Sequence, residues 1–274
     1  MGENNKHDYV IVGAGSAGCV LAHRLSENGR TDVLLLEAGT PDDHEAIHVP
    51  ARWRELVTSE FDWGYTTTPQ PGLDGRENYW PRGKTLGGSS SINAMMYVRG
   101  HPWDYDRWER LGNEGWSYEN LLPYYIRLED FEDGESEYHG EGGPLSLARR
   151  DSFDPVAMAF VEAAREVGFE DNDDFNAGRQ AGVGSFHLTA VDGQRQSTAV
   201  AYLHPVANRE NLTVETGAHV TRVRFEGDRA VGVEYEQADA GHEATATREV
   251  ILSGGAIASP QLLMLSGIGP ADYL

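Results

Sequence analysis

A glycine-rich turn near the N-terminus has the spacing that dinucleotide-binding proteins use around a pyrophosphate. Residues 13–18 read "GAGSAG", directly after the apolar run "YVIV" and before a segment with helical spacing. In such a unit the first glycine makes a tight turn, the second admits the pyrophosphate to the backbone, and the third lets helix and strand pack. The free N–H groups and partial positive charge of the helix N-terminus attract phosphate. We therefore expect Gly13, Gly15, Ser16, Ala17 and Gly18 to bind a dinucleotide.

The second apolar run of this unit ends in an acidic residue. Residues 33–39 read "VLLLEAG", which places Glu37 roughly 20 positions after the glycine turn, with Ala38 beside it. A carboxylate at this point accepts hydrogen bonds from ribose hydroxyls and repels a 2′-phosphate. The pattern favours FAD or NAD over NADP, and by itself it does not distinguish FAD from NAD.

Two further glycine-rich segments have a composition that would let a ligand approach the backbone closely. One is "RGKTLGGSSSINA" at 82–94, which presents amides and hydroxyls ahead of a helical turn; the other is "SGGAIASPQLLMLSGIG" at 253–269. In the second we expect Ser259 to cap a helix, Pro260 to lie in its first turn and Gly267 to end it. By composition alone, the first segment is equally compatible with a flexible loop, and the second with a simple strand-to-helix connection.

The order of the remaining segments predicts an α/β protein. We expect a strand at 8–12, a helix from Ser16 to Gly29, long loops over 40–82, a helical region at 102–112 and an acidic loop at 129–143. A helix should begin at Pro155 with Asp154 as its cap. Four β-like runs follow, "LTVET", "HVTRVRFEG", "RAVGVEYEQ" and "ATATREVIL", of which we expect the first three to form an antiparallel layer.

Composition narrows the classes of function. The net charge is -22 with a pI near 4.7, and Lys6 and Lys84 are the only lysines, so a nucleic-acid surface is not expected. Cys19 is the only cysteine and lies in an expected helix, which indicates a buried thiol and a reducing, cytoplasmic setting. We find no signal peptide and no stretch long enough to span a membrane.

The motifs together resemble the N-terminal half of a glucose-methanol-choline (GMC) oxidoreductase, and the choline dehydrogenase-like members most. The resemblance rests on "VGAGSAG" with "LLEAG", on "GKTLGGSSSINAMMYVRGHPWDYD" at 83–106, and on "GAIASPQLLMLSGIG" at 255–269, in that order. The segments "FDWGYTTTPQ", "YHGEGGPL" and "TAVAYLHP" also resemble the family, so the likeness covers essentially the whole chain. It implies one Rossmann-like FAD-binding domain over 1–274, with the βαβ unit at 8–39, a flavin loop at 81–106, an antiparallel β insertion at 211–253 and the second family signature at 255–269.

The resemblance also implies the cofactor and the residues that hold it. The cofactor is expected to be FAD, with the pyrophosphate at the first glycine turn and the adenosine ribose at Glu37. The residues expected to line the pyrophosphate and flavin ring are Gly87, Gly88, Ser89, Asn93 and Ala94, with Ala256 of the second signature near the cofactor. The backbone of Val220 should meet the adenine. Because Ile92 stands where some relatives carry a histidine linked to FAD, we expect non-covalent binding.

The implied reaction is the oxidation of a small-molecule alcohol, with hydride passing to the flavin. In the family the catalytic histidine lies near the C-terminus, beyond the point where this sequence stops, so we expect this chain to be inactive alone. We assign no catalytic residue and no metal ligand, and we expect His101, His139, His187 and His204 to be surface or packed residues. Three alternatives remain: a split enzyme with a separately encoded C-terminal half, a non-catalytic FAD-binding remnant, and a hydroxynitrile lyase-like relative without net redox chemistry.

The acidic, lysine-poor composition predicts a protein adapted to high salt, against the alternative of an ordinary acidic enzyme. At about 1 M salt the Debye length falls to roughly 3 Å, which screens the repulsion within a chain of net charge -22. We expect the melting temperature to rise between low and molar KCl in a thermal scan. A melting temperature that stays constant or falls over this range would contradict the salt adaptation.

Overall fold

The computed structural model describes residues 5–150 and 154–273. They belong to two compact units. The first, here called the sheet unit, comprises Met1–Asn93 and Ser197–Leu274, and the second, the inserted unit, comprises Ala94–Gln196. Each unit is described by itself.

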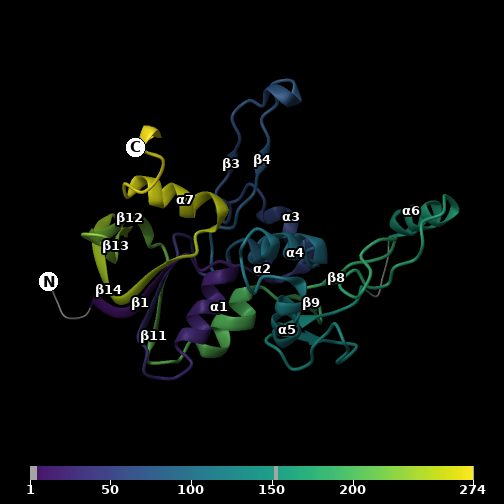
Figure 1. Cartoon of the computed structure of the whole chain (residues 1–274), viewed down its shortest axis with the longest axis horizontal. Coiled ribbons are helices and arrows are strands. Elements are labelled where there is room, and N and C mark those ends of the chain that lie inside the picture. Colours follow the sequence, from purple (N-terminus) through teal and green to yellow (C-terminus); the bar gives the residue numbers. More distant parts are fainter. Residues whose placement is uncertain (1–4, 151–153, 274) are drawn as a thin grey trace. The chain divides into compact units, whose positions relative to one another are not determined.

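A six-stranded sheet forms the centre of the sheet unit (Figure 1). Its order is β11 (Leu212–Glu215), β2 (Val33–Leu36), β1 (Lys6–Val12), β14 (Ala240–Leu252), β13 (Arg229–Gln237) and β12 (His219–Glu226). The strands β11, β2, β1 and β14 pair in parallel, whereas β14, β13 and β12 form an antiparallel meander. This mixed sheet confirms the expected α/β class.

The run "LTVET" was expected to join the antiparallel layer, and this prediction was wrong. This run forms β11, which pairs in parallel with β2 and does not join the antiparallel layer of β12, β13 and β14. The strand β2 is apolar and buried at all four positions, so water does not reach its backbone groups. A neighbouring strand on each side satisfies those groups, and β11 supplies the second neighbour.

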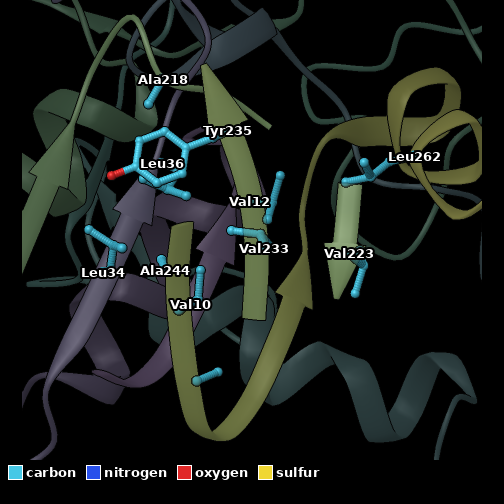
Figure 2. Close-up of a cluster of buried hydrophobic side chains, with 11 residues drawn as sticks. Val10, Val12, Leu34, Leu36, Ala218, Val223, Val233, Tyr235, Ala244 and Leu262 are labelled. Atoms are coloured by element: carbon cyan, nitrogen blue, oxygen red, sulfur yellow. The ribbon is translucent and has the colours of Figure 1, made fainter. Parts of the chain in front are cut away.

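Alternation of side chains along the central strands builds a core on one face of the sheet (Figure 2). Val10 and Val12 of β1 lie on this face together with Leu34 and Leu36 of β2, as the period of two requires. The meander and α7 (Gly255–Leu265) complete the cluster with Ala218, Val223, Val233, Tyr235, Ala244, Ala246 and Leu262. The core therefore fixes the strands whose carboxyl ends carry the glycine segments.

Helix α1 (Ser16–Leu25) packs against β1 and β2 through its buried residues Gly18, Cys19 and Ala22. It ends four residues before the expected stop at Gly29, because the chain turns at Ser26, whose hydroxyl donates to the Ala22 carbonyl at 2.8 Å. Gly29 lies in the following turn with φ of +65°.

Helix α7 also differs from expectation at its start. It begins at Gly255 with Gly254 as the cap, so the expected capping role of Ser259 was wrong and Pro260 lies inside the helix. The flexible Gly254–Gly255 pair, with φ of +83° at Gly255, allows the chain to turn directly from β14 into the helix. The expected end was right, since Gly267 follows the C-cap with φ of +84°.

The remaining elements of the sheet unit are short, and those within 40–82 agree with the long loops expected there. They are α2 (Glu45–His48), η2 (Pro50–Arg52), α3 (Trp53–Leu56), β3 (Tyr65–Thr66), η3 (Pro71–Leu73), β4 (Tyr79–Trp80), η4 (Gly88–Ser91), η5 (Ala199–Leu203), η6 (His204–Val206) and η7 (Ala271–Tyr273). The strands β3 and β4 pair as an antiparallel hairpin.

The inserted unit consists of short helices and two-stranded pairs. Its elements are β5 (Met96–Tyr97), α4 (Pro102–Arg110), α5 (Tyr118–Leu128), β6 (Glu129–Phe131), β7 (Leu145–Leu147), α6 (Pro155–Glu166), β8 (His187–Leu188), β9 (Ala190–Val191) and β10 (Gln194–Arg195). Asp154 caps α6 as expected, by accepting the Val156 N–H at 2.8 Å. The expected acidic loop at 129–143 instead begins with a buried strand, β6, in which Glu129 is fully enclosed.

Within the described ranges, 5–150 and 154–273, every helix is too short or too polar to cross a lipid bilayer.

Candidate functional site: a cradle of three glycine segments

The three glycine segments meet at the carboxyl ends of neighbouring parallel strands. The first follows β1, and the segment that opens with Ser253 follows β14, which pairs in parallel with β1. From β1 the sheet continues through β2 on one side and through β14 on the other. In open α/β sheets, ligands bind outside the carboxyl ends of the strands at such a switch point.

Close backbone approaches require glycine at both ends of the first segment. Gly13 has φ of +96° and donates its N–H to the Leu36 carbonyl at 2.7 Å, while a Cβ on it would lie 2.7 Å from the Ser253 oxygen. A Cβ on Gly18 would lie 1.9 Å from the Gly13 oxygen. These two glycines therefore hold the helix, the strand and the third segment together.

The second segment lies directly on the first. The Gly87 N–H donates to the Ala14 carbonyl at 2.8 Å, and a Cβ on Gly88 would lie 2.7 Å from the Gly15 Cα. The reverse case differs, because a Cβ on Gly15 would lie 3.9 Å from the Gly88 Cα, which is an ordinary contact. Gly15 therefore has free space that packing does not use.

Hydroxyl groups fix the second segment in place, so it is not a flexible loop. The Ser91 hydroxyl donates to the Leu86 carbonyl at 2.6 Å, and the Ser90 and Thr198 hydroxyls are 2.9 Å apart. Ser89 accepts the Gly83 N–H at 3.2 Å. The segment thus presents backbone and hydroxyl groups in a fixed arrangement.

Glu37 connects the end of β2 to the first glycine turn. Its side chain is buried, and its two oxygens accept the N–H groups of Ala14 at 2.8 Å and Gly39 at 2.9 Å. Burial raises the pKa of this carboxyl group, although the two backbone hydrogen bonds and the charge of Lys84 oppose that shift. A carboxylate has about four lone-pair sites, so roughly two remain for the hydroxyls of a ribose.

The expected adenine-side residue reaches the same edge of the sheet. The Glu37 carbonyl accepts the Ala218 N–H at 2.8 Å, and Val220 follows two residues later in β12. The pairing of β12 with β13 shifts register between Val220 and Arg222. The structure therefore places the residue before β12, two positions from Val220, beside Glu37.

The other expected residues differ in exposure. Ser16, Ala17, Ser89, Asn93 and Ala256 are exposed, Gly87 and Gly88 are buried, and Ala38 is half-buried. Ala94 is the first residue of the inserted unit and is half-buried. The exposed members, Ser16, Ala17, Ser89, Asn93 and Ala256, leave small and polar groups of the three segments available to a ligand.

Cys19, His204 and His101 behave as structural groups. Burial raises the pKa of the Cys19 thiol to about 12, and its Sγ lies 3.1 Å from the Ala14 carbonyl. His204 contacts Asp42 through Nε2 at 3.0 Å, and that hydrogen bond raises the pKa of His204. His101 caps α4 and is exposed.

A second cluster of titratable groups was missed by sequence reasoning. It consists of Glu129, His139, Asp174 and His187 in the inserted unit. The residues are far apart in sequence and have no ligand-type spacing. The sequence offers no local signal for the cluster, because the neighbourhoods of His139 and Asp174 are polar and glycine-rich.

The first of these sites fits a dinucleotide by its own geometry. Gly13, Gly15 and Gly88 carry no Cβ where the segments meet, a helix N-terminus faces the space beside them, and a buried carboxylate borders it. Backbone N–H groups and a helix terminus suit a pyrophosphate, and the carboxylate suits a ribose.

Comparisons with known proteins identify relatives of the chain. The family model described as GMC oxidoreductase matches residues 7–273. Mouse (Mus musculus) mitochondrial choline dehydrogenase is 51% identical over 278 residues, which cover 98% of this chain and 47% of the relative. The structure of pyridoxine 4-oxidase from Mesorbium loti is similar with a TM-score of 0.93 and 41% identity, covering 97% of this chain and 53% of that one. An FAD-dependent oxidoreductase from Chaetomium thermophilum gives a TM-score of 0.89 at 32% identity, covering 97% of this chain and 48% of that one.

The chain thus spans about half the length of the proteins that it matches.

The packing of the first segment leads to a stability prediction. Gly18→Ala should destabilise the fold by about 2 kcal/mol, because the new Cβ overlaps the Gly13 carbonyl and forces the helix away from the strand. Chemical unfolding followed by circular dichroism measures the change. The matched control is Gly241→Ala in β14, where a Cβ meets nothing within 4 Å. Equal stability of the two variants would contradict the packing role of Gly18.

Proposed function

The chain belongs to the GMC oxidoreductase family, a family of FAD-binding flavoproteins, and from this premise we propose that its sheet unit binds FAD non-covalently as part of an alcohol-oxidising enzyme. The observation that carries the proposal is the convergence of the three glycine segments around the first turn of α1. In this assignment the pyrophosphate lies against Gly15 and the exposed first turn, where unpaired helix N–H groups neutralise its charge.

Glu37 holds the adenosine ribose in this proposal. The Ala14 and Gly39 N–H groups fix the direction of its carboxylate before any ligand binds, so the remaining lone pairs are already positioned. The neighbouring Val220 offers its backbone to the adenine. Preorganisation of this kind lowers the entropy that binding must overcome.

Ile92 supports non-covalent attachment. It is only 4% exposed and packs in a cluster with Ala46, Ile47, Leu56 and Phe61 of the sheet unit. An aliphatic side chain has no nucleophilic atom for a bond to the flavin. The contacts with FAD would therefore be hydrogen bonds, packing and charge interactions.

We propose a small alcohol of the choline type as the substrate, because mouse choline dehydrogenase is a relative at 51% identity. Bound FAD would supply an acceptor for the hydride removed from a CH–OH donor. The proton of the hydroxyl group needs a base, and we propose that this base and the substrate pocket come from the part of the relatives that this chain does not match. The hydroxynitrile lyase-like alternative has no support from the relatives described above.

We further propose a reducing compartment such as the cytoplasm. The support is the single thiol, Cys19, which is fully buried and forms no disulfide.

The FAD assignment is tested by Gly15→Ala. An added Cβ fits the protein without a clash but occupies the space where the pyrophosphate is proposed, so FAD should bind at least about tenfold more weakly while the melting temperature of the FAD-free protein is unchanged. Quenching of flavin fluorescence on titration measures the affinity. Unchanged FAD affinity would contradict the assignment, and Gly241→Ala serves as the control for a glycine outside the cradle.

The substrate is tested by anaerobic bleaching of the flavin. The FAD-loaded chain alone should stay oxidised with choline, whereas a fusion to the C-terminal half of mouse choline dehydrogenase should be reduced. Tetramethylammonium is the control, because it keeps the quaternary charge and lacks the hydroxyl group. Reduction of the chain alone, or reduction of the fusion by other alcohols and not by choline, would contradict the proposal.

A further inference from the structure

Two buried histidines and an aspartate converge in the inserted unit. The side chains of His139 and His187 are each 3% exposed, and that of Asp174 is 23% exposed. They come from the loop after β6, the turn at 172–176 and strand β8. One ligand atom from each residue lies within 4.8 Å of the other two.

The distances within this cluster suit a small cation. His139 Nε2 lies 2.9 Å from Asp174 Oδ2, and His187 Nδ1 lies 3.9 Å from Asp174 Oδ1. A zinc ion with ligands at about 2.0–2.2 Å separates its ligand atoms by somewhat more than 3 Å. Side-chain rotations that bring the most distant pair closer by about 1 Å would complete such an arrangement.

His187 lacks any hydrogen-bond partner for its ring. Both ring nitrogens are buried, and neither has a partner among the described residues. Burial lowers the pKa of His187, and the nearby His139 lowers it further against the opposing charge of Asp174. A buried polar atom of this kind requires a partner.

A carboxylate orients the second imidazole. Glu129 Oε2 lies 2.9 Å from His139 Nδ1, on the side of the ring opposite Asp174. Glu129 is itself fixed by Arg99 and by the Tyr97 hydroxyl at 2.5 Å. Metal-binding histidines usually donate their other N–H to a carboxylate in this way, which fixes the tautomer.

Asp174 and the two imidazole rings are also held in position. Asp174 accepts the Asn176 N–H at 2.8 Å, and its own N–H donates to Asn172 at 3.0 Å. Phe131 packs against both imidazoles, with its ring centre 4.3 Å from that of His139 and 4.7 Å from that of His187. Such support reduces the entropy lost when a ligand binds.

We propose that His139 Nε2, the Asp174 carboxylate and His187 bind one divalent transition-metal ion, with Zn²⁺ as the ion that best matches two imidazoles and a carboxylate. Glu129 is the outer carboxylate that positions His139. A fourth position remains for water, because three protein ligands do not complete a tetrahedral zinc site.

Equilibrium dialysis of the purified full chain against ZnCl₂, followed by metal analysis, tests the proposal. We expect one tightly bound Zn²⁺ per chain, and we expect His187→Gln and Asp174→Asn each to weaken binding at least tenfold. The control is His101→Asn, which removes an exposed histidine of the same unit and keeps a side chain suited to the cap of α4.

Isothermal titration of the chain with ZnCl₂ measures the stoichiometry and the affinity independently. Binding below one equivalent per chain, equal affinity in His187→Gln and the wild type, or equal loss in His101→Asn would overturn the proposal. Circular dichroism of the metal-free variants shows that they are folded, and a variant that fails this check is replaced by His187→Asn.

Discussion

The sheet unit depends on one steric constraint, which is the backbone-to-backbone packing of glycine segments that are distant in sequence. A Cβ at Gly13 would overlap Ser253, and a Cβ at Gly88 would overlap Gly15. Because no side chain separates them, peptide groups of all three segments gather at the carboxyl ends of β1 and β14. The helix N-terminus and the carboxylate of Glu37 then border one space, and this arrangement is suited to a pyrophosphate and a ribose.

The inserted unit depends instead on a buried carboxylate and the groups that compensate its charge. Glu129 is fully buried there, and it is compensated by Arg99, Tyr97 and His139. Hydrogen bonds to these three groups keep its pKa below the usual value although burial opposes this. Removal of one partner from a buried charge of this kind is costly, so the network holds His139 in position. His187 packs against this ring, and its ring nitrogens have no hydrogen-bond partner among the described residues, which is the physical basis for the proposed cation.

Much of the sheet unit was predictable from local signals. The turn at Gly13–Gly18 and the acid at Glu37 have fixed spacing, and the continuous apolar runs at 9–12 and 33–36 indicate buried strands. Local signals failed where the outcome depended on distant partners. The parallel pairing of β11 follows from the need of buried β2 for a neighbour, and the early start of α7 follows from the flexibility of Gly254 and Gly255 beside Gly13.

The cluster in the inserted unit could not be predicted, because its members come together only through tertiary folding. His139, Asp174 and His187 lie on separate loops and a short strand, and each has an unremarkable sequence neighbourhood. The roles of Ser89, Asn93, Ala94, Val220 and Ala256 in cofactor binding also remain predictions, since they rest on the resemblance and on their positions near the glycine segments.

The central claim, that the chain binds FAD without a covalent bond, is tested most directly by the visible spectrum before and after acid precipitation. The protein is incubated with excess FAD in molar KCl, freed of unbound cofactor by gel filtration, and then denatured in acid. We predict flavin absorption on the protein at one FAD per chain and its complete transfer to the supernatant. Protein without flavin absorption would contradict FAD binding, and flavin that remains in the pellet would contradict non-covalent attachment.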